Sequence, residues 1–223
     1  MNIIKICLFF HFLLLQIHAL ALEKPVKIMI MGDSLSAAYG ILQEQSWVKL
    51  LEEETGKKYS LEFINASVSG ETTAGGKARL PALLAAHQPQ IVLLELGGND
   101  GLRAYPVKII RQNLQDMLAQ IKAAKADGLL MGIQIPGNYG QVYTQAFKSI
   151  YPELAAENQV AYLPFFLSEV ATQTKLMQAD GIHPNASAQP LLAAKVKTSL
   201  LKIIIEKYQR QAAVKVVNQN SVK

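Results

Sequence analysis

Five apolar runs separated by segments of helical periodicity constrain the fold of this chain more than any other feature. The runs cover 26–31, 61–64, 91–96, 129–135 and 160–163. Largely apolar strands of this kind are typical of a parallel sheet that is buried on both faces. Strands that alternate with helices predict a three-layer α/β/α fold. Five strands fit the flavodoxin-like order 2-1-3-4-5, in which ligands bind at the carboxyl ends of the first and third strands.

Helices are expected in the connections, at 45–54, 76–87, 106–121, 142–157 and 188–208. We expect Thr55 and Gly56 to end the first of them. Ser187 is a consistent N-cap for the last, because Pro190 then falls in the first turn, where no donor is needed. The chain has 223 residues, half of them hydrophobic. This is enough for one α/β domain with a real core.

The first residues predict a secretory signal peptide. Lys5 gives a basic start, 6–17 is largely apolar, and Ala19-Leu20-Ala21 offers the small residues that a signal peptidase reads. The apolar run is short for a membrane span, so an uncleaved anchor is the less favoured alternative. We therefore expect an exported protein, periplasmic where the host has an outer membrane. Its expected parts are a signal peptide, one domain and a polar basic tail without fixed structure, at 1–21, 22–208 and 209–223.

Cleavage after Ala21 would limit the chemistry of the mature chain. It would remove Cys7, the only cysteine, and with it any disulfide or thiol nucleophile. Of the four histidines, only His87 and His183 would remain. Two histidines without cysteines do not suggest zinc, and no phosphate-binding glycine motif follows the first strand, so neither a metal nor a cofactor is expected. The net charge of +5 is modest and spread out, which does not favour nucleic-acid binding.

A serine stands just beyond the first predicted strand. Gly32 ends this strand and Ser34 follows, at the sheet edge where α/β proteins bind ligands. We interpret Ser34 as a nucleophile, which needs a base held in one tautomer. His183 suits this role, because Asp180 precedes it by three residues and can reach its near ring nitrogen. His87 has no carboxylate nearby in the sequence and is interpreted as a surface residue.

Acyl transfer also needs donors for a developing oxyanion. The candidates are the backbone N–H groups of Ser34 and Gly70 and the side-chain amide of Asn99, on the loops after the first three strands. Asp33 is interpreted as a structural residue that accepts hydrogen bonds from loop amides. Glu95 lies inside the third apolar run and needs a partner if it is buried; Arg79 or Lys77 could serve.

Four sequence blocks resemble those of the SGNH (GDSL) hydrolases, and specifically the small periplasmic multifunctional esterases of the thioesterase I / protease I / lysophospholipase type. They are Gly32-Asp33-Ser34-Leu35-Ser36, 65–72, Gly97-Gly98-Asn99-Asp100 and 180–184. The resemblance covers about 27–201 and implies the SGNH hydrolase fold. It assigns Ser34 as nucleophile, His183 as base, Asp180 as its orienter, and Gly70 and Asn99 as oxyanion donors. It further implies substrate contacts from a movable loop after Asn99 and from the fourth strand's end, at Asp100, Gly101, Leu102, Ile135 and Pro136.

Together these features predict a serine esterase that acts through an acyl-enzyme on Ser34. The expected substrates are aryl esters, short-to-medium acyl esters, acyl thioesters and lysophospholipids. The apolar residues Leu102, Ile135, Phe165 and Phe166 favour acyl chains over the acetylated sugars of carbohydrate O-deacetylases, which share this fold. A non-catalytic binding module is the other alternative. Beyond a small substrate, we expect no nucleic-acid partner, at most peripheral membrane contact, and a monomer.

Overall fold

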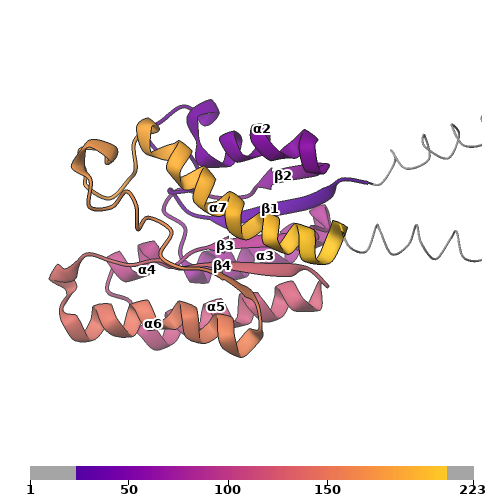
Figure 1. Ribbon diagram of the computed structural model, residues 1–223. Coiled ribbons are helices and arrows are strands. Elements are labelled where there is room, and N and C mark those ends of the chain that lie inside the picture. Colours follow the sequence, from indigo (N-terminus) through magenta and orange to yellow (C-terminus); the bar gives the residue numbers. More distant parts are fainter. Residues whose placement is uncertain (1–23, 210–223) are drawn as a thin grey trace, which may run out of the picture.

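A single parallel sheet organises residues 24–209, which are the residues that the computed structural model describes (Figure 1). The strand order is β2-β1-β3-β4-β5, and every neighbouring pair is parallel. This confirms the predicted flavodoxin-like order. The expected signal peptide at 1–21 and all but the first residue of the expected tail lie outside the described residues. The strands are β1 (Val26–Gly32), β2 (Leu61–Asn65), β3 (Ile91–Glu95), β4 (Asp127–Met131) and β5 (Ala161–Leu163).

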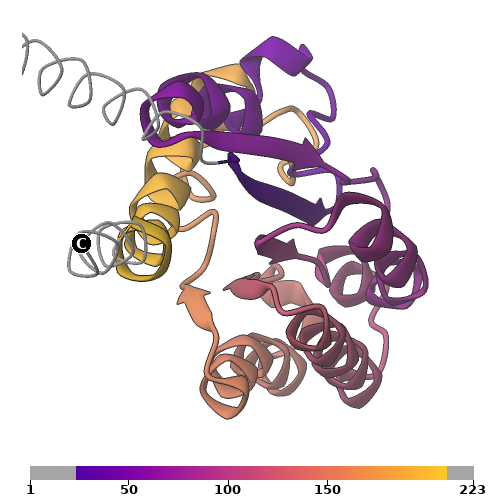
Figure 2. The same cartoon turned by 90° about the vertical axis from the view of Figure 1, so that its right-hand side faces the viewer.

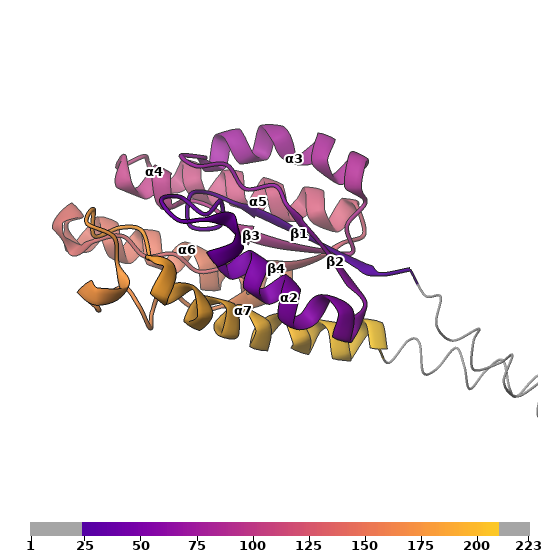
Figure 3. The ribbon, with the colours of Figure 1, turned by 90° about the horizontal axis from the view of Figure 1, so that it is seen from above.

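Helices cover both faces of the sheet, so the strands lie in the middle of three layers (Figures 2 and 3). One face carries α2 (Trp47–Tyr59) and α7 (Gln189–Ile203). The other carries α3 (Thr73–His87), α5 (Val107–Ala123) and α6 (Gln141–Asn158). Alternate residues of β1 point to opposite layers, as the pleat requires: Ile28 and Ile30 pack toward α2 and α7, whereas Met29 and Met31 pack toward the other layer. Burial on both faces explains why the strands are apolar.

Several boundaries differ from the prediction: α3 begins at Thr73 rather than Gly76, and β4 ends at Met131 rather than Ile135. Thr55 and Gly56 do not end α2, which continues to Tyr59. The Thr55 hydroxyl donates to the Leu51 carbonyl oxygen at 2.6 Å, so it is satisfied inside the helix and does not compete with the backbone. Ser187 is not the cap of α7 either. It belongs to a short 3-10 turn (Ala186–Ala188) whose cap is Asn185, and this turn leads directly into α7.

The connections after β1, β2 and β3 meet at one edge of the sheet. The register pairs Gly32 of β1 with Glu95 of β3, so the segments that follow these residues lie side by side. The short helix α4 (Gly98–Leu102) begins almost directly after β3. Gly97 allows this turn, because its φ of 118° is in the region that favours glycine and a Cβ there would lie 2.4 Å from the Tyr151 hydroxyl. Within residues 24–209, none of the helices combines the length and the apolar character that crossing a membrane requires.

Candidate active site

Ser34, Gly70, Asn99 and His183 line a single cavity of about 700 Å³ at the carboxyl edge of the sheet. Ser34 is in the turn after β1, Gly70 is between β2 and α3, and Asn99 is in α4. His183 comes from the irregular segment that leads to α7. The structure thus brings together residues from four separate stretches of the chain. The strand order had indicated this edge for Ser34, Gly70 and Asn99, and His183 had been assigned as the base.

Ser34, His183 and Asp180 form a hydrogen-bonded series. The Ser34 Oγ atom lies 2.8 Å from His183 Nε2, and His183 Nδ1 lies 2.6 Å from Asp180 Oδ2. The other carboxylate oxygen, Oδ1, accepts the backbone N–H groups of Ile182 at 2.9 Å and His183 at 3.0 Å. Asp180 therefore holds both the turn and the ring. A carboxylate at Nδ1 favours the tautomer whose Nε2 can accept the Ser34 proton.

The pKa of Asp180 keeps this carboxylate charged. Partial burial by itself would raise the pKa, but the hydrogen bonds donated by the His183 backbone, the His183 ring and the Ile182 backbone outweigh it and lower the pKa to about 2. The group is therefore ionised at any pH at which an esterase is ordinarily assayed. It can balance the positive charge that His183 acquires when it takes a proton from Ser34.

The expected substrate contacts divide into two groups. Leu102, Ile135 and Pro136 line the cavity, and its apolar wall is completed by Leu35, Ile133, Phe165, Leu167 and Met177. Asp100 and Gly101 are buried and do not line it, so their contacts with a substrate stay a prediction. Asp100 is 1 % exposed and accepts the backbone N–H and the hydroxyl of Thr73, at 2.8 and 2.6 Å. It ties α4 to the start of α3.

Two buried carboxyl groups lie beneath the nucleophile turn. Asp33 is 2 % exposed and Glu95 is 0 % exposed. Glu95 Oε2 accepts the Ser36 hydroxyl at 2.7 Å and the Asp33 backbone N–H at 3.3 Å. The proposed cationic partners were wrong, because Arg79 pairs with Glu71 and Lys77 pairs with Asp116. Gly32 makes the arrangement possible, since a Cβ there would lie 2.7 Å from Glu95 Oε2.

Burial controls the protonation of both groups. It raises the pKa of Asp33 to about 6, against the opposing effects of the Leu35 N–H, His183 and the Asn99 amide. Burial, reinforced by the nearby Asp33, raises the pKa of Glu95 well above its ordinary value. Among the described residues, Glu95 Oε1 is also buried without a hydrogen-bond partner, which suits a neutral carboxyl group better than a carboxylate. Burial and the unpartnered Oε1 therefore favour the protonated form of Glu95, whereas Asp33, with a pKa of about 6, is mostly ionised at neutral pH.

Replacing Glu95 with glutamine is expected to flatten the decline of stability toward alkaline pH. The folded wild type holds a proton on Glu95 that the unfolded chain releases above about pH 4.3. Wild-type stability therefore falls by up to about 1.4 kcal/mol per pH unit until the pH passes the folded-state pKa. Glutamine has the same shape, can still accept from Ser36, and does not titrate.

Urea unfolding across a pH series measures the difference in stability between the wild type and Glu95→Gln. The control is Glu62→Gln at an exposed position of β2. Parallel stability curves for wild type and Glu95→Gln would contradict the assignment.

Tyr39 is a site residue that sequence reasoning missed. Its ring packs on the His183 imidazole with centroids 4.5 Å apart, and it lines the cavity while remaining 51 % exposed. The Gln178 amide holds the two loops together by donating to the carbonyl oxygens of Tyr39 at 2.8 Å and Pro184 at 3.1 Å. No local pattern indicates this contact, because Tyr39 and His183 meet only when the sheet has formed.

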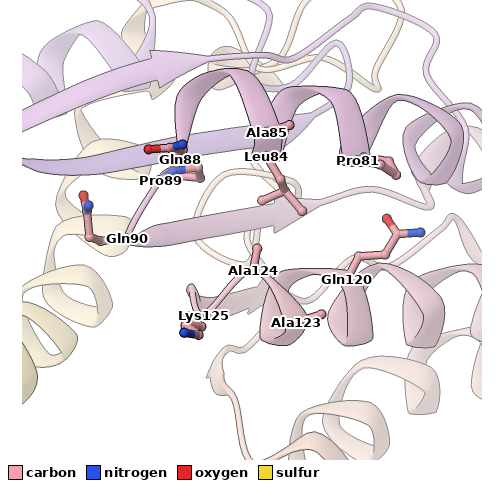
Figure 4. A pocket seen from close by; sticks show the side chains of 10 residues that line it. All are labelled: Pro81, Leu84, Ala85, Gln88, Pro89, Gln90, Gln120, Ala123, Ala124 and Lys125. Carbon is pink, nitrogen blue, oxygen red and sulfur yellow. The ribbon is translucent and has the colours of Figure 1, made fainter.

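A second cavity of about 700 Å³ shows that size alone does not identify the site. It lies between α3 and α5, at the amino end of β3, and is lined mostly by apolar side chains and amides such as Leu84 and Gln120 (Figure 4). Its lining contains no serine, histidine or carboxylate. Within residues 24–209, no group of three or more histidine, cysteine or acidic side chains is arranged to hold a metal ion. The chemistry of the described residues therefore points to the cavity at Ser34.

Comparison with known proteins agrees with this geometry. The model of the GDSL-like Lipase/Acylhydrolase family matches residues 30–189. The chain is 51 % identical over 166 residues to "Thioesterase 1/protease 1/lysophospholipase L1" of Escherichia coli K12, covering 74 % of this chain and 79 % of that protein. It is 45 % identical to an "Arylesterase" of Vibrio mimicus, covering 82 % and 92 %.

A solved structure extends the likeness to the fold. This is the psychrotrophic esterase EstA from Pseudoalteromonas sp., inhibited by monoethylphosphonate, with a TM-score of 0.76 and 42 % identity over 80 % of this chain and 98 % of that one. The family match covers more than half of the chain, and the relatives are well above 30 % identical over most of it. The chain therefore belongs to the GDSL-like lipase/acylhydrolase family, the SGNH hydrolases.

Proposed function

We propose that this protein hydrolyses carboxylic esters and acyl thioesters through an acyl-enzyme on Ser34. The observation that carries the proposal is the series from Asp180 through His183 to Ser34, with distances of 2.6 and 2.8 Å, at the rim of an apolar cavity. A serine hydroxyl becomes a useful nucleophile when an oriented histidine can remove its proton. The names of the relatives, thioesterase, lysophospholipase and arylesterase, support the same class of reaction.

In the first half of the reaction, His183 Nε2 takes the Ser34 proton while Oγ forms a bond to the carbonyl carbon. The carbonyl oxygen becomes an oxyanion, which the backbone N–H groups of Ser34 and Gly70 and the Asn99 amide stabilise. The carbon–oxygen or carbon–sulfur bond then breaks, and His183 gives its proton to the leaving alcohol or thiol. In the second half, His183 activates water in the same way, the acid leaves, and Ser34 regains its proton.

The substrates are aryl esters, short-to-medium acyl esters, acyl thioesters and lysophospholipids. Leu102, Ile135 and Phe165 contribute to the apolar wall and give an acyl chain a surface on which to lie. The enzyme acts as a monomer with at most peripheral membrane contact. It is exported, and the periplasm is its compartment where an outer membrane exists; the basic and apolar pattern of 1–21 supports this.

A fluorophosphonate probe tests the proposal directly, because it labels only a serine that is activated as a nucleophile. The probe is expected to label the wild-type protein on Ser34 and to leave Ser34→Ala unlabelled. The inhibition of the related EstA by monoethylphosphonate supports the choice of a phosphorus electrophile. An unlabelled wild type would favour a binding module. Turnover of acetylated sugars is measured beside a chain-length series of p-nitrophenyl esters. Faster hydrolysis of the acetylated sugars than of every acyl-chain ester would contradict the proposed substrate class.

A further inference from the structure

We propose that Asp33 is a positioning residue that selects the orientation of the Asn99 side-chain amide and so keeps its N–H donor directed at the oxyanion. The inference rests on the proposed esterase function. It assigns to Asp33 a role for Asn99 that parallels the role of Asp180 for His183. Asp180 selects one of the two His183 tautomers, and Asp33 selects one of the two Asn99 amide orientations; in each case only one of the two supports catalysis.

The contact between the two residues is direct. Asn99 Nδ2 donates to Asp33 Oδ2 at 3.2 Å, while the other carboxylate oxygen, Oδ1, accepts the Leu35 backbone N–H at 3.0 Å. Asp33 is 2 % exposed, so water does not compete freely for these oxygens. With a pKa of about 6, raised by burial, its carboxylate is mostly ionised at neutral pH and can only accept hydrogen bonds. An acceptor-only neighbour can pair with the nitrogen of Asn99 but not with its oxygen.

This pairing decides what Asn99 presents to the cavity. The amide nitrogen has two N–H groups, and Asp33 uses one of them, so the second remains for the cavity that Asn99 and Ser34 both line. In a flipped amide, Asn99 Oδ1 would take the place of Nδ2 and would face both Asp33 Oδ2 and the oxyanion. Both contacts are repulsive. Without Asp33, little distinguishes the two orientations, because the oxygen and nitrogen of an amide are nearly equal in size.

The position of Asp33 is itself fixed by the buried Glu95. Glu95 Oε2 accepts the Asp33 backbone N–H at 3.3 Å and the Ser36 hydroxyl at 2.7 Å, which holds the residues on both sides of Ser34. The register that pairs Gly32 with Glu95 makes these contacts possible. Asp33 can therefore act as a rigid reference for Asn99 rather than following its movements.

A double-mutant cycle with Asp33→Asn and Asn99→Ala tests the inference. Asparagine at position 33 keeps the size of the side chain, and its oxygen can still accept the Leu35 N–H. Its NH₂ group then faces Asn99 and pairs with the Asn99 oxygen, which favours the flipped amide. We expect Asp33→Asn to lower kcat for p-nitrophenyl butanoate about 10- to 100-fold with KM changed less than about twofold, and Asn99→Ala to lower kcat about 100-fold or more. The double variant should be no slower than Asn99→Ala within about threefold, because Asp33 acts through Asn99.

If the fold-losses in kcat of the two single variants multiply in the double variant, the inference is overturned, because Asp33 then acts independently of Asn99. A trifluoromethyl ketone that forms an oxyanion on Ser34 provides a second readout. Its inhibition constant should rise in Asp33→Asn by the same factor as kcat falls, and an unchanged constant would also overturn the inference. Thermal unfolding checks that the variant is folded. If Asp33→Asn does not fold, Asp33→Ser replaces it in the same cycle with the same expected outcome.

Two controls separate this inference from more general effects. Asp116→Asn makes the same chemical change on α5, where Asp116 pairs with Lys77 at the surface, and should leave kcat unchanged. Ser34→Ala sets the background rate. A wild-type rate equal to that background would overturn the proposed esterase function itself. An active wild type combined with multiplied losses would overturn the role of Asp33 alone.

Discussion

Replacing either Ser34 or His183 with alanine is expected to lower kcat for p-nitrophenyl butanoate by at least about 10⁵-fold. Without Ser34 no acyl-enzyme can form, and without His183 nothing removes the hydroxyl proton at neutral pH. The two losses should not multiply, because nucleophile and base act as one unit. Steady-state kinetics of both single variants and the double variant measure this directly.

Both variants should remain folded, because neither side chain is part of the two apolar layers that flank the sheet. Ser149→Ala on α6 and His87→Ala at the end of α3 are the matched controls and should keep wild-type rates. Retention of more than about one hundredth of the wild-type kcat in Ser34→Ala or His183→Ala would remove these residues from the proposed mechanism.

The sheet could be predicted because its strands are buried on both faces. Burial requires runs such as 26–31 and 91–96 to be apolar, and the connections between them are short enough to leave few arrangements. Helix ends were less predictable. Thr55 looks like a breaker in the sequence, yet its hydroxyl bonds back to Leu51 inside α2. Whether a threonine ends or continues a helix depends on which backbone group its hydroxyl hydrogen-bonds, and the composition of the segment does not reveal this.

The site residues could be predicted where the chain offers few residues of the required type and where the strand order places them at one edge. With only His87 and His183 in the expected mature chain, the choice of base was narrow, and parallel strands bring Ser34, Gly70 and Asn99 to one edge. The contacts that were missed depend on the register of the strands. Asn99 reaches Asp33 across 66 positions, and this contact exists only because Gly32 pairs with Glu95.

A pattern of residue types cannot specify that register, nor can it show which of two neighbouring polar side chains points into a cavity. Asp100 illustrates the second point. It follows the cavity-lining Asn99 directly, but its carboxylate turns away from the cavity to hold Thr73. Its role is therefore to join two elements of the site.

Replacing Asp180 with asparagine is expected to lower kcat by about 10⁴-fold while leaving a measurable residual activity. The asparagine oxygen can still accept the backbone N–H groups of Ile182 and His183, so the turn should keep its shape. Its NH₂ group, however, can donate to His183 Nδ1. That contact favours the tautomer with a proton on Nε2, which then faces the Ser34 hydroxyl with a donor instead of an acceptor.

The residual activity distinguishes an orienting residue from the nucleophile. The oxyanion donors and the apolar cavity still act in Asp180→Asn, so its kcat should stay about tenfold or more above that of Ser34→Ala. Because the pKa of Asp180 is about 2, its charge in the wild type is lost only as the pH falls toward that value. Titration of Asp180 therefore adds no step to the wild-type pH–rate profile above about pH 4. A kcat for Asp180→Asn within about tenfold of wild type would mean that His183 keeps its productive tautomer without a charged partner.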